Sequence, residues 1–256
     1  MITSLRFFYL SFLLICAASA VAQTGPGGVG NATGSSGQPQ NRLWLRADAG
    51  TSTSVNNAPV SSWSDQSGNG NVASQTGAAR PTYQSGVVNG KPVLRFNTSG
   101  GTASQSIRVN SALGVAQTGG FHYFIVTKRN GTLNSFGSLG TGGGPTGGVY
   151  LLDRTTATTP LASLKALPGN LYGFQKRDNA SSIGGVSSTT QIDGTNFQIV
   201  NYQRQRGVAY RLFLNGTQEG GDLTDADGDL LPPLPASAAT RTPIRAVRSM
   251  ATSPKY

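Results

Sequence analysis

The sequence is poor in the residues on which most enzyme active sites depend, with one cysteine, one histidine and one glutamate. Cys16 lies in an apolar N-terminal segment, so the rest of the chain has no thiol for a disulfide, a zinc site or a nucleophile. A glycosidase needs two carboxyl groups flanking the scissile bond, but Glu219 is the only glutamate, and the aspartates outside residues 222–229 are isolated. His122 lies in an aromatic run, which is more typical of a packed or rim residue than of a catalyst. The sequence therefore predicts no catalytic residues and a protein that is not an enzyme.

Only the N-terminus carries a long apolar run. Arg6 precedes apolar residues from Phe7 to about Ala18, and Ala20-Val21-Ala22 offers small residues for cleavage, as in a secretory signal peptide. The segment is short for a membrane anchor, and no later run has membrane-spanning length. We therefore expect residues 1–22 to be removed near Ala22, leaving a secreted, extracellular protein with no transmembrane segment.

Glutamate and lysine are scarce, whereas the chain has 35 glycines and many Ser, Thr and Asn residues. This composition disfavours long helices, and short clusters of Val, Ile, Tyr, Phe and Thr favour strands. A formal charge of +10 would suit an acidic partner such as a polyanionic glycan, a nucleic acid or a membrane surface. Because the basic residues are scattered, a soluble Arg-rich surface is the better interpretation, and we predict no nucleic-acid partner. The sequence thus predicts an all-β protein.

The chain begins its predicted domain after a polar leader. Residues 23–41 are rich in Gly, Pro and Ser and cannot bury enough apolar surface to offset the entropy of ordering them. Leu43–Asp48 alternates apolar and polar residues and predicts the first strand. Asn89-Gly90 lies between two strand-like runs, which is the strongest local signal for a two-residue hairpin. Pro92 should then begin its strand or lie at a sheet edge.

Further strands are predicted at regular spacing. Phe121–Lys128 is apolar on both strand faces, so we expect it to be buried on both sides. Leu161–Leu167 predicts a single helical turn. The remaining strand candidates are Val149–Leu152, Leu171–Phe174, Phe197–Tyr202 and Val208–Leu214. In the last of these, one face carries Val208, Tyr210, Leu212 and Leu214, and Asn215-Gly216 closes the next turn. Short strands separated by turn residues indicate a β-sandwich.

The stretch from Trp63 to Phe96 organises the rest of the chain. A polar loop of Ser, Gly and Asn follows Trp63, and the apolar run that ends at Phe96 closes the stretch. Sugar recognition needs an apolar face for stacking and fixed hydrogen-bonding groups. The candidate ligand-binding residues are therefore Trp63, Asp65, Asn69 and Asn71. The alternative is that Trp63 belongs to the core and the loop is only a turn.

One dense carboxylate cluster, in residues 222–229, suggests a calcium site. Calcium favours several hard oxygen ligands from a loop, and we name Asp225, Asp227 and Asp229 as its candidate ligands. The match to an EF-hand is partial, because Leu230 and Ala236 occupy the positions of its glycine and its bidentate glutamate. The alternative is a solvated acidic turn.

Five segments together resemble the concanavalin A-like lectin/glucanase superfamily, and more narrowly the laminin G-like domains of bacterial secreted and cell-surface proteins. They are Leu43–Asp48, Val60–Asn71, Arg80–Tyr83, Asn89–Phe96 and Leu212–Gly216. The resemblance implies a jelly-roll sandwich of two antiparallel sheets, an extracellular bacterial setting, and a role in glycan binding or adhesion. The Glu-x-Asp-x-x-Glu pattern of the laminarinase-type enzymes is missing, which supports a non-catalytic interpretation.

Three functions follow as hypotheses. The first is a secreted, non-catalytic module that binds an extracellular polysaccharide or cell-surface glycan. The second is a structural spacer with protein partners, and the third is a polysaccharide-degrading enzyme.

The end of the predicted domain, residues 42–247, departs from the pattern of the family that it resembles. Domains of that family usually end with an alternating apolar strand beside the first strand, and residues 248–256 form an irregular tail without one. Our hypothesis is a chain truncated or frameshifted near Ala246, with a sandwich that lacks its last strand.

Overall fold

The computed structural model describes residues 25–35, 37–97, 105–109, 113, 119–130, 150–152, 161–177 and 183–225. The fold is all-β, with antiparallel strands and two single-turn 3-10 helices, η1 (Pro26–Gly28) and η2 (Gly77–Ala79). The first five strands are β1 (Ser62–Ser64), β2 (Val72–Ser74), β3 (Thr82–Val88), β4 (Lys91–Arg95) and β5 (Arg108–Val109). The others are β6 (Phe121–Thr127), β7 (Tyr150–Leu152), β8 (Leu161–Leu167), β9 (Leu171–Arg177), β10 (Ile183–Gln191), β11 (Gln198–Gln205), β12 (Ala209–Leu214) and β13 (Thr217–Thr224). No helix in the described part of the chain is long and apolar enough to cross a membrane.

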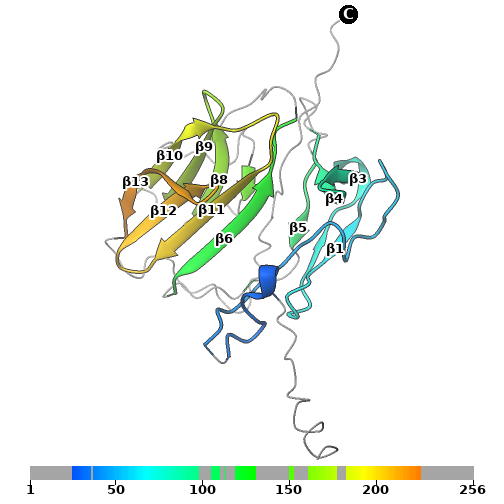
Figure 1. Cartoon of the computed structure of the whole chain (residues 1–256), viewed down its shortest axis with the longest axis horizontal. Helices are drawn as coiled ribbons and strands as arrows, with labels where there is room; N and C mark the ends of the chain where they lie inside the picture. The colour runs from blue at the N-terminus through cyan, green and yellow to red at the C-terminus, as the bar shows by residue number, and fades with distance from the viewer. Residues whose placement is uncertain are drawn as a thin grey trace, which may run out of the picture.

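Two four-stranded sheets pack face to face (Figure 1). The front sheet has the order β13-β12-β11-β6, and the back sheet has the order β10-β9-β8-β7. Between them the ring of Phe174 stacks on that of Tyr202 with centroids 3.8 Å apart. The hydroxyl of Tyr172 in the back sheet donates a hydrogen bond of 2.8 Å to Gln198 Oε1 in the front sheet. This strand order confirms the all-β sandwich, and the jelly-roll winding stays a prediction.

One hydrophobic core fills the space between these sheets. Its central side chains come from alternate positions of the strands, so the period-2 pattern of each strand decides which residues are inside. The buried members are Leu164, Ala166, Tyr172, Phe174, Val186, Ile192, Val200, Tyr202, Tyr210, Leu212 and Leu214.

A second core lies outside the sandwich, among β1–β5. The sheet β1-β2-β5 and the hairpin β3-β4 accompany it, and its buried residues are Trp63, Ala73, Phe96, Ile107 and Val109. Figure 1 shows these short strands beside the sandwich. The stretch from Trp63 to Phe96, together with Ile107 and Val109, thus builds a core that is separate from the cluster between the two large sheets.

Both Asn-Gly hairpins form as predicted. Asn89 and Gly90 have φ of 47° and 74°, and Asn215 and Gly216 have φ of 50° and 86°. These left-handed values suit the two central residues of a turn that follows the twist of the flanking strands. Pro92 lies in β4 of a two-stranded sheet, where both strands are edges, also as predicted.

Leu43–Asp48 is not a strand. Its backbone bonds to the Trp63 loop instead of a ladder: Gln66 N donates to Trp44 O, and Trp44 N donates to Asp65 Oδ1. The alternation still has meaning, because Leu43, Leu45 and Ala47 pack against the second core.

Three other predictions for the sandwich are wrong. Leu161–Leu167 is strand β8, paired with β9 along its whole length, and not a helical turn. Strand β6 is half-buried on its inner face and exposed on its outer face, because the back sheet covers only the inner face of the front sheet. Val208 lies in the turn before β12 and is exposed, so it does not share the buried face of Tyr210.

Candidate functional site

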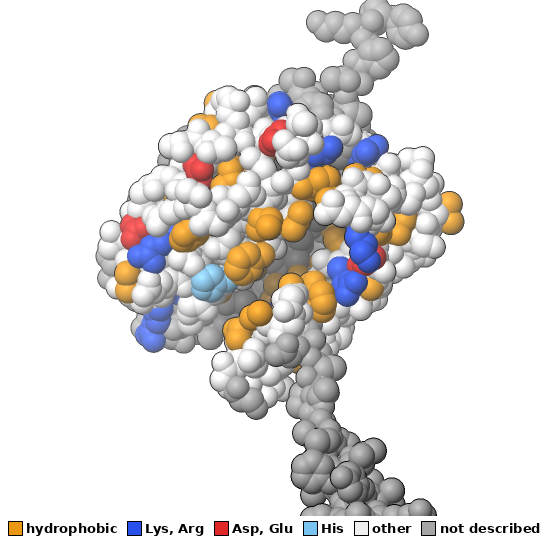
Figure 2. Space-filling view, in the orientation of Figure 1, with side chains coloured by type: hydrophobic (Ala, Val, Ile, Leu, Met, Phe, Trp, Pro, Cys, Tyr) orange, Lys and Arg blue, Asp and Glu red, His pale blue; other side chains and the backbone are white. Residues whose placement is uncertain are grey.

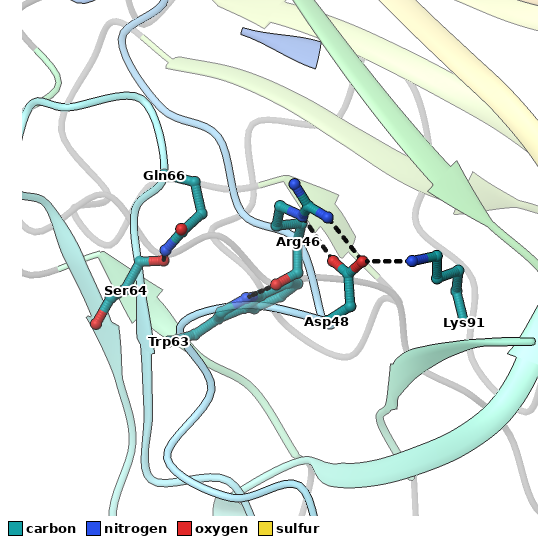
Figure 3. A network of polar contacts seen from close by, with 6 residues as sticks. All are labelled: Arg46, Asp48, Trp63, Ser64, Gln66 and Lys91. Carbon is teal, nitrogen blue, oxygen red and sulfur yellow. Dashed lines mark hydrogen bonds and ion pairs between the residues drawn. The ribbon is translucent and has the colours of Figure 1, made fainter. Parts of the chain in front are cut away.

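Trp63 is a core residue of the structure. Its side chain is 8% exposed, and its indole N–H donates a hydrogen bond of 2.8 Å to the carbonyl oxygen of Arg46. Figure 3 shows this bond below the Arg46 side chain. A buried ring offers no face for a sugar to stack on, which agrees with the alternative that the sequence left open.

The polar residues of the same loop hold it against residues 41–44. Asp65 Oδ1 accepts from the backbone N–H groups of Trp44 and Ser67, each at 2.8 Å. The side-chain amide of Asn69 donates to Asn41 O at 2.7 Å, and that of Asn71 donates to Arg42 O at 3.0 Å. These bonds give Asp65, Asn69 and Asn71 a structural role, and ligand binding by the loop stays a prediction.

An exposed ion cluster lies beside this loop (Figure 3). The guanidinium group of Arg46 donates to both oxygens of Asp48, at 2.6 and 2.7 Å, and Lys91 Nζ lies 3.2 Å from Asp48 Oδ2. The hydrogen bond from Arg46 holds the pKa of Asp48 well below its usual range. This cluster joins the segment before β1 to the β3-β4 hairpin.

Asp225, one of the three calcium candidates, is the buried partner of Arg204. The two side chains are 3% and 1% exposed, and Arg204 Nε donates to Asp225 Oδ2 at 2.9 Å. The carboxylate also accepts from Gly207 N at 3.0 Å. Asp227 and Asp229 lie outside the described residues. In the described part of the chain, no three His, Cys, Asp or Glu residues lie close enough together to hold a metal ion.

Glu219 is buried where the two sheets of the sandwich meet at the edge formed by β10 and β13. Its carboxylate accepts four hydrogen bonds of 2.7 to 3.0 Å from the backbone and hydroxyl groups of Thr189 and Thr190. Burial by itself would raise the pKa of Glu219, but these bonds outweigh it and lower the pKa to about 2. The glutamate therefore ties the two sheets together as a carboxylate.

This geometry predicts a pH-dependent contribution to stability. Because the pKa of Glu219 is lower in the folded state than its ordinary 4.5, the ionised group stabilises the fold above about pH 4.5. That stabilisation is lost as the pH falls from 4.5 towards 2. Urea unfolding of the wild-type chain and Glu219→Gln at stepped pH should show a gap in stability that narrows over this window. A gap of constant size from pH 7 to pH 2 would contradict the prediction.

The outer face of the front sheet carries the most prominent exposed hydrophobic side chains of the sandwich. Phe124 is 68% exposed and Val126 59%, both on β6, and Ile199 on β11 is 48% exposed. Figure 2 shows hydrophobic side chains gathered on this face beside the single histidine, in pale blue. Contiguous exposed apolar patches on a protein surface often mark interaction sites.

The strand register arranges these side chains in rows across the sheet. Phe124 pairs with Asn201, and Asn201 pairs with Phe213, so one row has two aromatic residues with an amide between them. Asn201 is 9% exposed and donates to Tyr123 O at 3.1 Å, so it lies lower than Phe124. We call Phe124, Asn201 and Phe213 the aromatic row.

A second row, which we call the polar row, consists of His122, Gln203 and Arg211. The pairs His122–Gln203 and Gln203–Arg211 place these residues next to one another on three strands. The His122 ring also stacks with Phe124, with centroids 6.1 Å apart. Arg211 donates to Asp222 at 2.9 and 2.7 Å and to Gln205 Oε1 at 2.7 Å, which fixes its guanidinium group. The face thus combines stacking surface with ordered hydrogen-bonding groups.

This face was not predicted from the sequence. Apolar residues on both strand faces of Phe121–Lys128 indicated burial on both sides, which would place Phe124 in the core. The sequence does not show how β6 pairs with β11, nor that the back sheet covers only one face of the front sheet and leaves the ring of Phe124 exposed on the other.

No model of a known protein family and no curated protein matches the chain. The resemblance to concanavalin A-like and laminin G-like domains therefore stays a prediction, and the functional argument depends on the surface itself.

Proposed function

We propose that the protein is a non-catalytic carbohydrate-binding module and that the outer face of the front sheet is its binding site. The observation that carries the proposal is the aromatic row, in which Phe124 is exposed, Phe213 is half-buried and Asn201 is buried, next to the polar row. Sugars present apolar faces made of C–H groups and rims of hydroxyl groups, so they need stacking rings beside fixed donors and acceptors. Phe124 supplies an exposed ring, with His122 and Gln203 of the polar row beside it, and Arg211 lies beside Phe213.

The proposal moves the predicted site from the Trp63 loop to the sandwich. In the loop, the aromatic ring is buried and the polar groups bond to the chain itself. On the sheet, the ring of Phe124 is exposed to solvent. Secretion through the N-terminal segment would bring such a site to extracellular polysaccharides, in keeping with the predicted signal peptide.

A second candidate function is a spacer that contacts other proteins. The observation in its favour is the pair Val126 and Ile199, whose exposed aliphatic side chains are neighbours on β6 and β11. These aliphatic groups suit a protein interface better than a sugar. The rings of the aromatic row and the side chains of the polar row suit a sugar better.

The test is a binding screen with the purified mature chain on a panel of soluble and insoluble polysaccharides. We expect retention on at least one of them, and Phe124→Ala should abolish most of it. Val208→Ala is the matched control, because Val208 is also an exposed apolar residue but lies in the turn before β12. No retention on any polysaccharide, or equal retention by Phe124→Ala, would refute the proposal. Release of new reducing ends or unsaturated products would replace it with an enzyme.

A further inference from the structure

The geometry points to one class of ligand for this face: an extended, β-linked polysaccharide whose chain crosses the strands of the front sheet along the aromatic row. This inference depends on the proposed function and adds the linkage type and the direction of the chain. It follows from the spacing of two rings, from the position of the polar row, and from the shape of a sheet face.

The spacing of the rings comes from the strand register. Phe124 on β6 and Phe213 on β12 pair with the same residue of β11, so they are two strand spacings apart in one row. Two spacings of a β-sheet amount to about 10 Å. In an extended β-1,4-linked chain, successive sugars are turned over, so alternate sugars present the same face, and the repeat of one disaccharide is close to this distance. Each ring of the row can therefore stack on every second sugar.

The amide between the rings fits the same ligand. Asn201 is nearly buried, because its side chain bonds to the backbone of β6 instead of projecting outwards. The sugar unit between the two stacked sugars would therefore lie above Asn201, a polar side chain close to the backbone of the sheet. No third ring is present at this position of the row.

The polar row runs parallel to the aromatic row. The two rows are two residues apart along each strand, which is about 7 Å, the reach of a hydroxyl group at the rim of a stacked sugar. Arg211 is already held by Asp222, and Gln218 donates to the same carboxylate at 2.7 Å. Hydrogen-bonding groups that are fixed before binding lose little conformational entropy on binding a ligand.

The type of glycosidic linkage is inferred from the shape of the polysaccharide chain. A sheet face is an extended surface, and an extended β-1,4-linked chain can contact both rings at once. An α-1,4-linked chain coils and can contact only one ring. Two contacts on one chain strengthen binding more than a single contact, because the second forms within the same complex.

The experiment compares hydroxyethyl cellulose and xylan with amylose, using the full mature chain and affinity electrophoresis. We expect the protein to bind the β-1,4-linked polymers and to bind amylose with at least tenfold lower affinity. Phe213→Ala should weaken binding to the β-linked polymers about tenfold, which corresponds to the loss of a contact of about 1.4 kcal/mol. Val208→Ala should bind like the wild type. Binding of amylose as tight as that of the β-linked polymers would overturn the inference but leave the proposed function standing, whereas no binding of any polysaccharide would end both.

A shifted-ring variant tests the spacing itself. Gln218 on β13 pairs with Phe213 and is exposed, so Phe213→Ala combined with Gln218→Phe keeps two rings in one row but sets them three strand spacings apart. We expect this variant to bind no better than Phe213→Ala alone. Full recovery of wild-type affinity would overturn the inference. Sedimentation experiments give a further outcome that would overturn the inference: a wild-type protein that forms a dimer and a Phe124→Ala variant that is monomeric. The face would then be covered by a second copy of the chain and not by a polysaccharide. Circular dichroism spectra matching the wild type confirm that each variant is folded.

Discussion

Replacing Asp225 by alanine is expected to lower the free energy of unfolding by about 3 to 5 kcal/mol, the usual cost of removing one partner of a buried ion pair. Arg204 is 1% exposed in the structure and would keep its charge without the carboxylate that it contacts at 2.9 Å. The variant would also leave Gly207 N without its acceptor. The measurement is urea unfolding of the purified protein at neutral pH.

The exposed pair Arg211–Asp222 provides a matched control. It has similar contacts, at 2.7 and 2.9 Å, but the side chain of Asp222 is 45% exposed. The charge that remains in Asp222→Ala is that of Arg211, which is 20% exposed to water and also donates to Gln205 Oε1, so this variant should lose less stability than Asp225→Ala. Equal losses in the two variants would contradict the prediction, because burial would then not decide the cost.

A double variant separates the charge from the packing. Arg204→Met with Asp225→Leu removes both buried charges and keeps much of the apolar volume, and such replacements are often neutral or stabilising. We expect it to recover most of the stability that Asp225→Ala loses.

The same ion pair explains why the aspartate cluster was hard to interpret from its sequence alone. An acidic run predicts a calcium loop or a solvated turn, and only the fold shows that Arg204 faces Asp225.

Local signals in the sequence predicted local structure well. Asn89-Gly90 and Asn215-Gly216 determine tight hairpins through the backbone conformations that Asn and Gly tolerate, and both hairpins formed. The buried face of β12 followed from its alternation, apart from Val208, which lies in the turn before the strand. Such signals depend on neighbours in the sequence, so they are visible without the fold.

Strands β10 and β13 were missed for a physical reason. They are rich in Gly, Ser and Thr and show no apolar alternation, because they meet each other at the edge of the sandwich. At Gly220, with φ of 67°, a Cβ atom would lie 2.7 Å from Ser187 O, so close approach of the two strands requires glycine. The residues that allow this contact are those that weaken a strand signal in the sequence.

The proposed binding face depends on long-range strand pairing in the same way. His122 and Phe124 are neighbours in the sequence, but Gln203, Arg211 and Phe213 join them only through the pairing of three strands. Long-range register decides which side chains share a surface, and a shift of one residue would turn each of them to the core. The loop at Trp63 looked more like a site because its polar residues are consecutive.

Phe174→Ala is expected to be the most destabilising substitution of an apolar residue in the sandwich, at about 3 to 5 kcal/mol. Phe174 is fully buried in the back sheet, and its ring lies 3.8 Å from that of Tyr202 and 5.6 Å from that of Tyr210, both in the front sheet. Alanine would remove the contact between the two layers and leave a cavity that the surrounding strands cannot fill. Thermal and urea unfolding of the purified protein would measure the loss.

Phe124→Ala is the matched control for this substitution. It removes the same side chain from the outer face of the front sheet, where Phe124 is 68% exposed, so it should leave the free energy of unfolding nearly unchanged. The two variants together separate a ring that holds the sheets together from a ring that is available to a ligand. If Phe124→Ala destabilised the chain as much as Phe174→Ala, the outer ring would be part of the fold, and the face could not serve as a free binding surface.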